Sequence, residues 1–179
     1  MRIISGSLRG RKLNKPKTDL VRPSKDMVKE SMFNIVQFEV FGASVLDLFA
    51  GTGQLGIEAL SRGAKSAVFV DNNGESVKLV KENLKICAFS DVSMVYNTDA
   101  LKYLENEEKF DIIFVDPPYD SNLARDAIIK ISEFDKLTKN GIMMCETAVD
   151  YELPNLATPY MLQKTYKYGV TLVHCFRRD

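Results

Sequence analysis

The sequence predicts a doubly wound α/β domain, because three observations agree. From residue 44 onward, short apolar runs alternate with amphipathic segments whose apolar side chains recur at helical spacing. The apolar runs are continuous rather than alternating, which is typical of a parallel sheet covered by helices on both faces. A glycine-rich turn follows the first of these runs, at the position where such sheets bind ligands.

The predicted elements follow one another in a regular order. Strands are expected at 44–49, 66–71, 92–97, 110–116 and near 141–146, with helices at 54–62, 75–87, 99–105 and 122–133. Residues 161–176 then contain two strand-like runs joined at Tyr168 and Gly169, with no room for a crossover helix. We therefore expect the last two strands to be antiparallel.

Residues 1–37 are predicted to form an extension in front of this sheet. Residues 2–13 alternate apolar and polar side chains around Gly6 and Ser7, which indicates a short β-hairpin. A loop rich in proline and lysine follows, and Ser24 is placed to cap a helix that runs to about Gln37. No repeat or long linker divides the sequence, so we expect a single domain over residues 1–179.

The charges cancel in total but are segregated along the chain. There are 24 Lys and Arg against 24 Asp and Glu, in a chain that is 45% apolar and 27% charged, which fits a globular rather than a disordered protein. Residues 1–30 carry nine basic and three acidic side chains, and residues 160–179 carry four basic and one acidic. Both ends are therefore basic, and the region between them is acidic.

The cysteines and the apolar runs argue against several classes of protein. Cys87, Cys145 and Cys175 are odd in number and form no C-x-x-C pair, so the sequence indicates neither a disulfide framework nor a zinc site. No apolar run approaches the length of a membrane span, and the N-terminus has no apolar signal core. We expect a soluble, cytoplasmic protein that binds no metal and no membrane.

The glycine-rich turn is the first candidate site. After the strand that contains Asp47, the pattern Gly-x-Gly-x-x-Gly opens a helix, so the backbone can approach a ligand closely. Asp71 ends the next strand, where a carboxylate can accept hydrogen bonds from both ribose hydroxyls of a nucleoside. A turn that only packs tightly is the alternative. The predicted cofactor-binding residues are Asp47, Phe49, Ala50, Gly51, Thr52, Gly53, Asp71, Asn72, Asp99 and Ala100.

The choice of cofactor depends on Asp47. A carboxylate four residues before the first glycine would repel a pyrophosphate at the helix N-terminus, so NAD fits poorly. S-adenosylmethionine carries a sulfonium and an ammonium group and no phosphate, and is the cofactor we expect. Asp99 is placed to accept a hydrogen bond from the adenine amino group, and it is also a compatible helix N-cap. A structural carboxylate bonded to loop amides remains the alternative for Asp47.

The second candidate site is Asp116-Pro117-Pro118-Tyr119, directly after an apolar strand. Two successive prolines remove two amide donors and leave the Asp116 carboxylate and the Pro117 carbonyl as acceptors. Two acceptors in fixed positions suit an exocyclic NH2 group, which they orient toward a methyl donor. Tyr119 offers a ring face for an extruded base. A plain turn containing two prolines is the alternative.

These motifs resemble those of a known family along essentially the whole chain. DLFAGTGQLGIEAL together with DPPY is similar to class I S-adenosylmethionine-dependent methyltransferases that act on exocyclic amino groups. The N-terminal RIISGSLRGRKL and RPSKDMVKESMFNI resemble the RsmD family, bacterial methyltransferases that modify the N2 amino group of a guanine in 16S ribosomal RNA. Lys29 and Ser24 depart mildly from the arginine and threonine that are usual there.

The resemblance implies a Rossmann-like sheet of seven strands with an antiparallel last strand, and the roles given above for the glycine loop, Asp71, Asp99 and residues 116–119. It implies 16S ribosomal RNA as partner, in an assembling or assembled small subunit, and we expect a monomer. The basic chain ends would then contact RNA phosphates, unless they are simply a solvated surface. The predicted RNA-binding residues are Arg2, Arg9, Arg11, Lys12, Arg22, Lys25 and Arg177.

Three other functions share part of this pattern. An adenine-N6 nucleic-acid methyltransferase also uses DPPY, but 179 residues leave little room for a separate target-recognition domain. A glutamine-modifying protein methyltransferase usually has asparagine where Asp116 stands. An NAD-binding module would use the glycine loop and Asp71, yet it gives no reason for Asp47 or for the two prolines.

Overall fold

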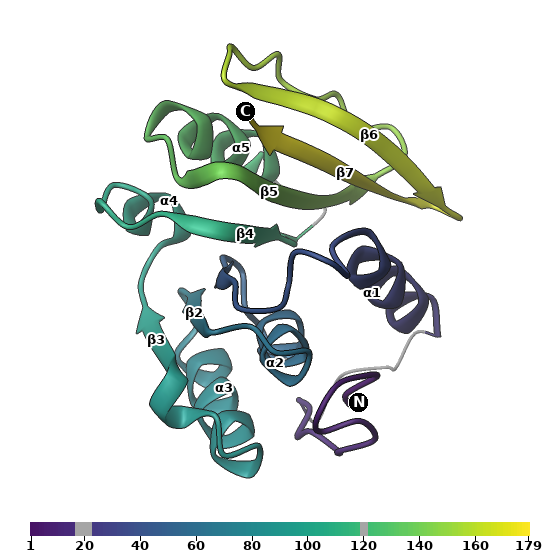
Figure 1. Cartoon of the computed structure of the whole chain (residues 1–179), viewed down its shortest axis with the longest axis vertical. Helices are drawn as coiled ribbons and strands as arrows, with labels where there is room; N and C mark the ends of the chain where they lie inside the picture. The colour runs from purple at the N-terminus through teal and green to yellow at the C-terminus, as the bar shows by residue number, and fades with distance from the viewer. Residues whose placement is uncertain (17–22, 119–121) are drawn as a thin grey trace.

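A computed structural model of the chain describes residues 1–16, 23–118 and 122–179, and its centre is one seven-stranded sheet (Figure 1). The strands lie in the order β3-β2-β1-β4-β5-β7-β6. They are β1 (Ser44–Asp47), β2 (Ser66–Asp71), β3 (Ser93–Asn97), β4 (Phe110–Val115), β5 (Leu137–Ala148), β6 (Tyr160–Tyr168) and β7 (Thr171–Arg178). The predicted α/β class is thereby confirmed.

The direction of the strands also agrees with the expectation. β1 to β5 are parallel to one another, and β7 lies antiparallel between β5 and β6. β6 and β7 are joined by a tight turn at Gly169, which has φ of 60°. This is the seven-stranded sheet that the resemblance to class I methyltransferases implies.

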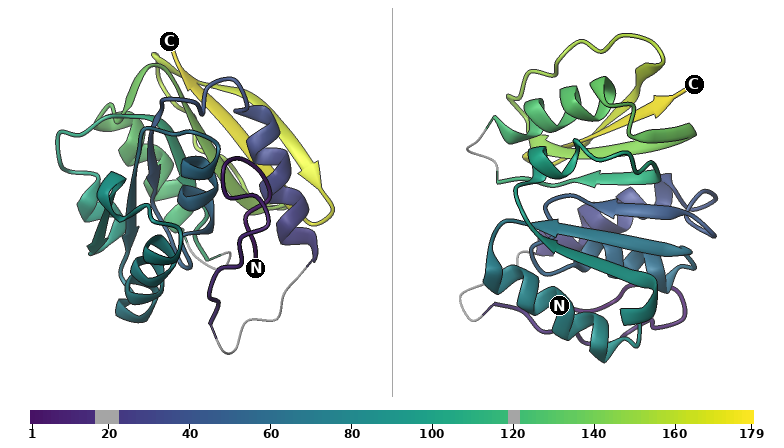
Figure 2. Two further views of the ribbon diagram at one scale, coloured as in Figure 1. Left: turned by 60° about the horizontal axis from the view of Figure 1, so that its bottom comes forward. Right: turned by 90° about the vertical axis from the view of Figure 1, so that its left-hand side faces the viewer.

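Helices cover both faces of the sheet, as the continuous apolar strands predicted (Figure 2). One face carries α1 (Pro23–Ile35), α2 (Gln54–Ser61) and α3 (Gly74–Ile86), and the other carries α4 (Ala100–Tyr103) and α5 (Leu123–Glu133). A short 3-10 helix, Ser90–Val92, precedes β3. The largest difference from the predicted bounds is at β5, which begins four residues early, whereas α1, β1 and α4 each end two residues early.

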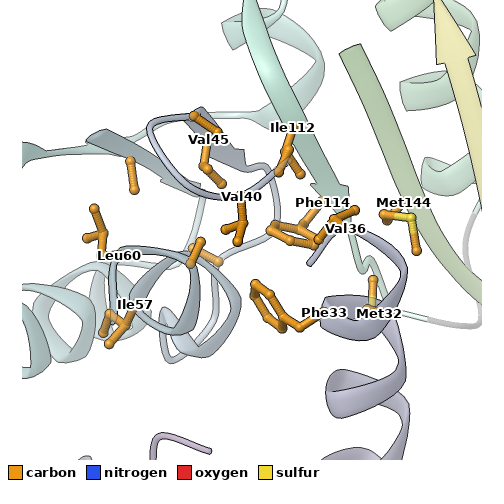
Figure 3. Packing of buried hydrophobic residues seen from close by; sticks show 14 of the residues in the cluster. Met32, Phe33, Val36, Val40, Val45, Ile57, Leu60, Ile112, Phe114 and Met144 are labelled. Atoms are coloured by element: carbon orange, nitrogen blue, oxygen red, sulfur yellow. The ribbon is translucent and has the colours of Figure 1, made fainter. Parts of the chain in front are cut away.

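The core under α1 fixes this helix against the middle of the sheet (Figure 3). Met32 and Phe33 are fully buried and face Phe114 of β4 and Met144 of β5, and the two phenylalanine ring centroids are 5.3 Å apart. Burying each such side chain contributes roughly 1.5–3 kcal/mol. The N-terminal extension is therefore part of the core of the domain rather than an appendage.

The predicted N-terminal hairpin is reduced to a single antiparallel bridge between Arg2 and Lys12. Beyond this bridge, the N-terminal arm bonds to α2 instead of continuing the pairing. The carboxylate of Glu58 accepts hydrogen bonds from the N–H groups of Ile4 and Ser5, at 2.8 and 2.9 Å. The carbonyl of Ser61 accepts another from Ser7 at 2.7 Å. The segment therefore forms a loop that is docked on α2.

Glu58 also joins this loop to α1. It is fully buried, lies 3.7 Å from the ammonium of Lys29, and accepts a hydrogen bond from Arg62 at 2.9 Å. The Lys29 ammonium in turn donates to the carbonyl of Arg2 at 3.3 Å. Losing one partner of such a buried pair costs about 3–5 kcal/mol, because the other charge is left uncompensated. This network fixes the loop, α1 and α2 relative to one another.

Candidate functional site

Each of the five parallel strands carries a carboxylate at or just after its carboxyl end. Asp47 and Asp71 end β1 and β2, Asp99 and Asp116 follow β3 and β4, and Glu146 lies near the end of β5. All five line one cavity of about 520 Å³. Small-molecule sites commonly have volumes of about 300–1,000 Å³, and this end of the sheet is where open α/β sheets bind ligands.

Nine of the ten predicted cofactor-binding residues line this cavity. The exception is Gly53, which is buried beneath the loop. Its φ of 75° is left-handed, and a Cβ there would lie 3.3 Å from side-chain atoms of Ile57 and Val80, so a side chain is disfavoured. Gly53 therefore shapes the loop, and the backbone of its neighbours 49–52 forms the cavity wall.

The third glycine of the turn allows α2 to approach the sheet closely. A Cβ on Gly56 would lie 2.3 Å from the ring of Phe69 in β2, which leaves no space for a side chain. The N–H of Gly56 donates to the Asp47 carboxylate at 2.9 Å. The glycine pattern predicted from sequence thus places the start of α2, and Asp47 beneath it, at the cavity.

Asp47 has a strongly perturbed pKa. Only 2% of it is exposed, and burial, with smaller contributions from the nearby Asp116 and Asp71 carboxylates, raises its pKa to about 8. The hydrogen bond from Gly56 works in the opposite direction but does not compensate. The structural alternative, a carboxylate bonded to a loop amide, is thus realised in part. This hydrogen bond is compatible with a ligand role for Asp47, because a cation in the cavity would stabilise the charged carboxylate.

Asp71 and Asp99 line the cavity beside the glycine loop. The two oxygens of Asp71 accept one backbone hydrogen bond each at 2.8 Å, Oδ2 from Gly51 and Oδ1 from Asn73. Each carboxylate oxygen can accept a second hydrogen bond, so this arrangement leaves capacity for two hydroxyl groups. Asp99 caps α4 through a bond from the Lys102 N–H at 2.9 Å, as expected for an N-cap. Asn72 and Ala100 complete this part of the lining.

The segment after β4 brings acceptors to the opposite side of the same cavity. Asp116, Pro117 and Pro118 all belong to the lining, with Pro117 buried and Pro118 exposed. Neither proline has an N–H, so this wall presents oxygen acceptors without amide donors. Tyr119, the fourth predicted residue of this motif, lies outside the described residues.

Two charged lining residues were missing from the sequence prediction. Glu146 is buried on β5, and a signal for it existed, since it ends an apolar run as the other four acids do. Lys29 is buried on α1 and reaches the cavity next to Met32. Its spacing in the sequence gave no indication that it faces a ligand site rather than solvent.

The predicted RNA-binding residues separate into two groups. Arg2, Arg9, Arg11 and Lys12 are exposed on the docked loop at the N-terminus. Arg22 lies outside the described residues, and Lys25 lies in α1 with its side chain undescribed.

Arg177 does not belong with this group. β7 is antiparallel to its neighbours, so its last residues lie at the amino end of the sheet, away from the cavity, and Arg177 pairs with Ile142 of β5. Its guanidinium donates to Glu39 at 2.7 Å and to Gln163 at 2.9 Å. Its contact with RNA stays a prediction, at a position away from the cavity. The guanidinium connects β7 to β6 and to the segment that follows α1.

The Cys145 thiol and the His174 imidazole lie in surroundings that indicate structural roles. Burial, with contributions from Asp116 and Glu146, raises the pKa of the Cys145 thiol well above its usual value, so a thiolate nucleophile is disfavoured. His174 lies between the hydroxyls of Thr147 and Thr165, at 2.9 Å each, and burial lowers its pKa to about 4. Within residues 1–16, 23–118 and 122–179, we find no cluster of side chains suited to a metal and no helix able to span a membrane.

Comparisons with known proteins identify relatives of the whole chain. A family model described as Conserved hypothetical protein 95 matches residues 1–177. The ribosomal RNA small subunit methyltransferase D of Haemophilus influenzae is 38% identical over 157 residues, which cover 86% of this chain and 81% of that protein. The Escherichia coli protein of the same name is 32% identical over 181 residues, or 100% and 90% of the two chains. The solved structure of yhhF from Escherichia coli has a TM-score of 0.90 at 29% identity, covering 100% and 98%.

Proposed function

Because this chain belongs to the RsmD family of ribosomal RNA methyltransferases, we propose that it methylates the exocyclic N2 amino group of a guanine in 16S ribosomal RNA, with S-adenosylmethionine as methyl donor. The single observation that carries the proposal is the cavity itself. It combines a glycine loop with carboxylates from five strands, and one wall is the Asp-Pro-Pro segment.

The charge of the cavity supports a cationic cofactor without phosphate. Asp47 lies at the start of α2, where a pyrophosphate would normally bind, and a dianion there would oppose its ionisation, whereas a cation would favour it. Asp71 has capacity for the two ribose hydroxyls, and Asp99 lies beside it for the adenine amino group. The sulfonium and ammonium groups of S-adenosylmethionine would instead be stabilised by Asp47.

The chemical step requires mainly orientation. S-adenosylmethionine supplies an electrophilic methyl group on a sulfonium, whose departure as a neutral thioether needs no proton donor. Asp116 and the carbonyl of Pro117 accept hydrogen bonds from the guanine N2 amine and direct it into the cavity. Asp116 is also placed to accept the proton that the amine loses on methylation. Tyr119 remains the predicted stacking partner of the base.

The exposed basic side chains of the docked loop support an RNA surface beside the site. Arg2, Arg9, Arg11 and Lys12 lie on the segment whose neighbour Met1 lines the cavity. Arg22 and Lys25 belong to the same proposal, because Arg22 directly precedes α1 in sequence and Lys25 lies in its first turn. RNA affinity should then fall steeply as salt rises, since each phosphate contact releases counterions.

The double charge reversal R9E/R11E tests this surface. We expect it to weaken RNA binding by about 10- to 100-fold at moderate salt and to flatten the salt dependence, with S-adenosylmethionine affinity unchanged. K164E, on the exposed edge strand β6, is the matched charge reversal elsewhere. Equal RNA affinity of wild type and R9E/R11E would contradict the proposed surface.

The remaining parts of the proposal concern the biological setting. We propose that the protein acts as a monomer in the cytoplasm, on 16S ribosomal RNA in an assembling or assembled small subunit, and that residues 1–179 form one domain. The docking of the N-terminal loop on α2 supports the single domain, because its amides bind Glu58 and Ser61.

Transfer from labelled S-adenosylmethionine to purified ribosomal RNA and subunits tests the reaction. We expect label in N2-methylguanosine after digestion to nucleosides. Label in N6-methyladenosine would favour the adenine-N6 alternative. Calorimetry with NAD and S-adenosylmethionine separates the NAD-binding module, because only the latter should bind.

A further inference from the structure

The proposed function leaves one cavity carboxylate without a role. Four aspartates account for the cofactor and for the N2 amine, whereas Glu146 is assigned to neither. Glu146 is only 9% exposed and lies on β5, the last of the parallel strands that reach the cavity. Its place in the lining brings it within reach of a ligand in the cavity, close to the Asp-Pro-Pro wall.

The strand register places Glu146 beside Asp116. β4 and β5 are parallel, with Phe114 opposite Met144 and Val115 opposite Cys145, so Asp116 and Glu146 follow at the same level. Neighbouring strands are about 4.8 Å apart, and paired residues point to the same face. Phe114 and Met144 both pack under α1 (Figure 3). Asp116 and Glu146 each follow two residues later, so they share the α1 face of the sheet.

The α1 side of the cavity agrees with this placement. Lys29 and Met32 of α1 belong to the same lining as Asp116 and Glu146. The glycine loop and Asp71 lie on the other side of β1, where the strand order places β2. Glu146 is therefore on the substrate side of the transferred methyl group, next to the Asp-Pro-Pro wall and away from the proposed adenosine position.

A second carboxylate beside Asp116 matches the chemistry of guanine. The Watson–Crick edge of guanine presents the N1–H donor next to the N2 amine, so two neighbouring donors face two neighbouring acceptors. Adenine and 2,6-diaminopurine have an unprotonated N1, which is an acceptor. An ionised carboxylate has no proton to donate, so it attracts guanine and repels these two bases.

We propose that Glu146 forms a guanine-reading subsite, in which its carboxylate accepts the N1–H of the target base while Asp116 and Pro117 hold the N2 amine. This inference rests on the proposed function, and it adds the residue that distinguishes guanine from other bases with an exocyclic amine. Glu146 is a specificity-determining and positioning residue in this account, and the methyl transfer itself depends on Asp116.

The test compares two bases at one position. The target guanine is first mapped, and 16S ribosomal RNA is then prepared by ligation with either guanine or 2,6-diaminopurine there, in the form that wild-type protein methylates. Both bases carry the N2 amine, and only guanine has N1–H. We expect wild type to prefer guanine by about 100-fold or more in kcat/KM, because a buried acceptor is left facing another acceptor in the analogue.

The variant E146Q sharpens the test, because its amide can donate to an unprotonated N1. We expect kcat/KM for guanine to fall by about 10- to 100-fold and the preference over 2,6-diaminopurine to shrink by about tenfold or more, with S-adenosylmethionine affinity unchanged. E152Q is the matched control, since Glu152 is exposed and does not line the cavity. If Glu146 has only a structural role, E146Q should lower kcat/KM equally for guanine and for 2,6-diaminopurine.

The outcomes separate this inference from the proposed function. Equal use of guanine and 2,6-diaminopurine by wild type, or an unchanged preference in E146Q, would overturn the subsite and leave guanine-N2 methylation intact. Failure of wild type to methylate any guanine would overturn the proposed function as well. The comparison of the two bases with wild-type protein needs no variant, so it tests the guanine-reading subsite even when E146Q folds poorly.

Discussion

The two ends of the sheet place their acidic side chains in opposite environments. At the carboxyl end, five carboxylates converge on one cavity, and the pKa of Asp47 is raised to about 8 by burial and by its acidic neighbours. At the amino end, acids are matched with donors. Asp111 accepts hydrogen bonds from the N–H and hydroxyl of Ser44, both at 2.8 Å, and from the hydroxyl of Thr138 at 2.6 Å.

Asp135 completes the amino end of the sheet. Arg178 binds both of its oxygens, at 2.5 and 3.0 Å, and Lys109 approaches one of them at 2.5 Å. The Arg178 guanidinium, assisted by Lys109, holds the pKa of Asp135 well below its usual value. Partial burial works to raise the pKa of Asp111, but the bonds from Thr138 and Ser44 outweigh it.

This contrast separates carboxylates that stabilise the fold from carboxylates kept for a ligand. Paired acids at the amino end contribute stability to the free protein. The acids of the cavity are held close to one another at a cost, which a bound cation would relieve. The function of each end can thus be tested by changing one acid at a time and measuring activity, binding and stability separately.

The largest effect should come from removing the acceptor for the amine. We expect D116A to lose methyl transfer by about 10³-fold or more, because the amine is no longer oriented and its proton has no acceptor. S-adenosylmethionine affinity, measured by calorimetry, should change little. D126A is the matched control, since Asp126 is exposed on α5 outside the cavity. Retained turnover in D116A would remove Asp116 from the mechanism.

A smaller effect should appear in the pH dependence of cofactor binding. Free Asp47 is mostly protonated at pH 7 because its pKa is about 8, and the cationic cofactor favours the ionised form. Binding should therefore release a proton, and affinity should rise by up to about tenfold per pH unit between pH 6 and 8. D47N should bind more weakly at pH 8 and lose this dependence. A wild-type affinity that does not vary over this range would contradict the coupling.

The smallest effect should be on stability, and it should distinguish the amino end of the sheet from the carboxyl end. D111N removes the charge and replaces one of the two acceptor oxygens with an amide nitrogen, so we expect a loss of about 1–3 kcal/mol in the free energy of unfolding. Turnover at a temperature where the variant is folded should stay at the wild-type level. A large loss of turnover with unchanged stability would reverse the assignment of this end of the sheet.

The pH dependence of stability should have opposite signs for Asp47 and Asp111. The pKa of Asp111 is lowered on folding, so its stabilisation is present above about pH 4 and is lost as pH falls further. The pKa of Asp47 is raised, so the folded state holds its proton more tightly and stability falls as pH rises from about 4 to about 8. Without cofactor, the stability of D47N relative to wild type should therefore increase over that interval, as followed by urea unfolding.

Much of the carboxyl end could be predicted from the sequence, because local patterns determine it. Apolar runs gave the strands, and the residues that end them gave Asp47, Asp71, Asp99 and Asp116. Glu146 obeys the same rule, because it stands at the end of the apolar run that predicted the strand near 141–146. The predicted β-hairpin failed for a different reason. Its amides bind Glu58 and Ser61, which lie more than fifty residues away, and no local pattern reports such contacts.

Arg177 shows how topology can overrule composition. A basic C-terminal segment indicated an RNA contact, yet an antiparallel β7 carries that segment to the amino end of the sheet. The antiparallel direction was itself predicted from the sequence, and it places Arg177 away from the cavity. Its partner Glu39, by contrast, could be found only from the three-dimensional packing of the segment after α1.

The most direct test of the central claim is mass mapping of 16S ribosomal RNA from cells with and without the gene. The account predicts that one N2-methylguanosine is lost in cells without it, and that wild type restores this methyl group whereas D116A does not. Unchanged 16S ribosomal RNA, or a missing methyl group on adenine, would contradict the account.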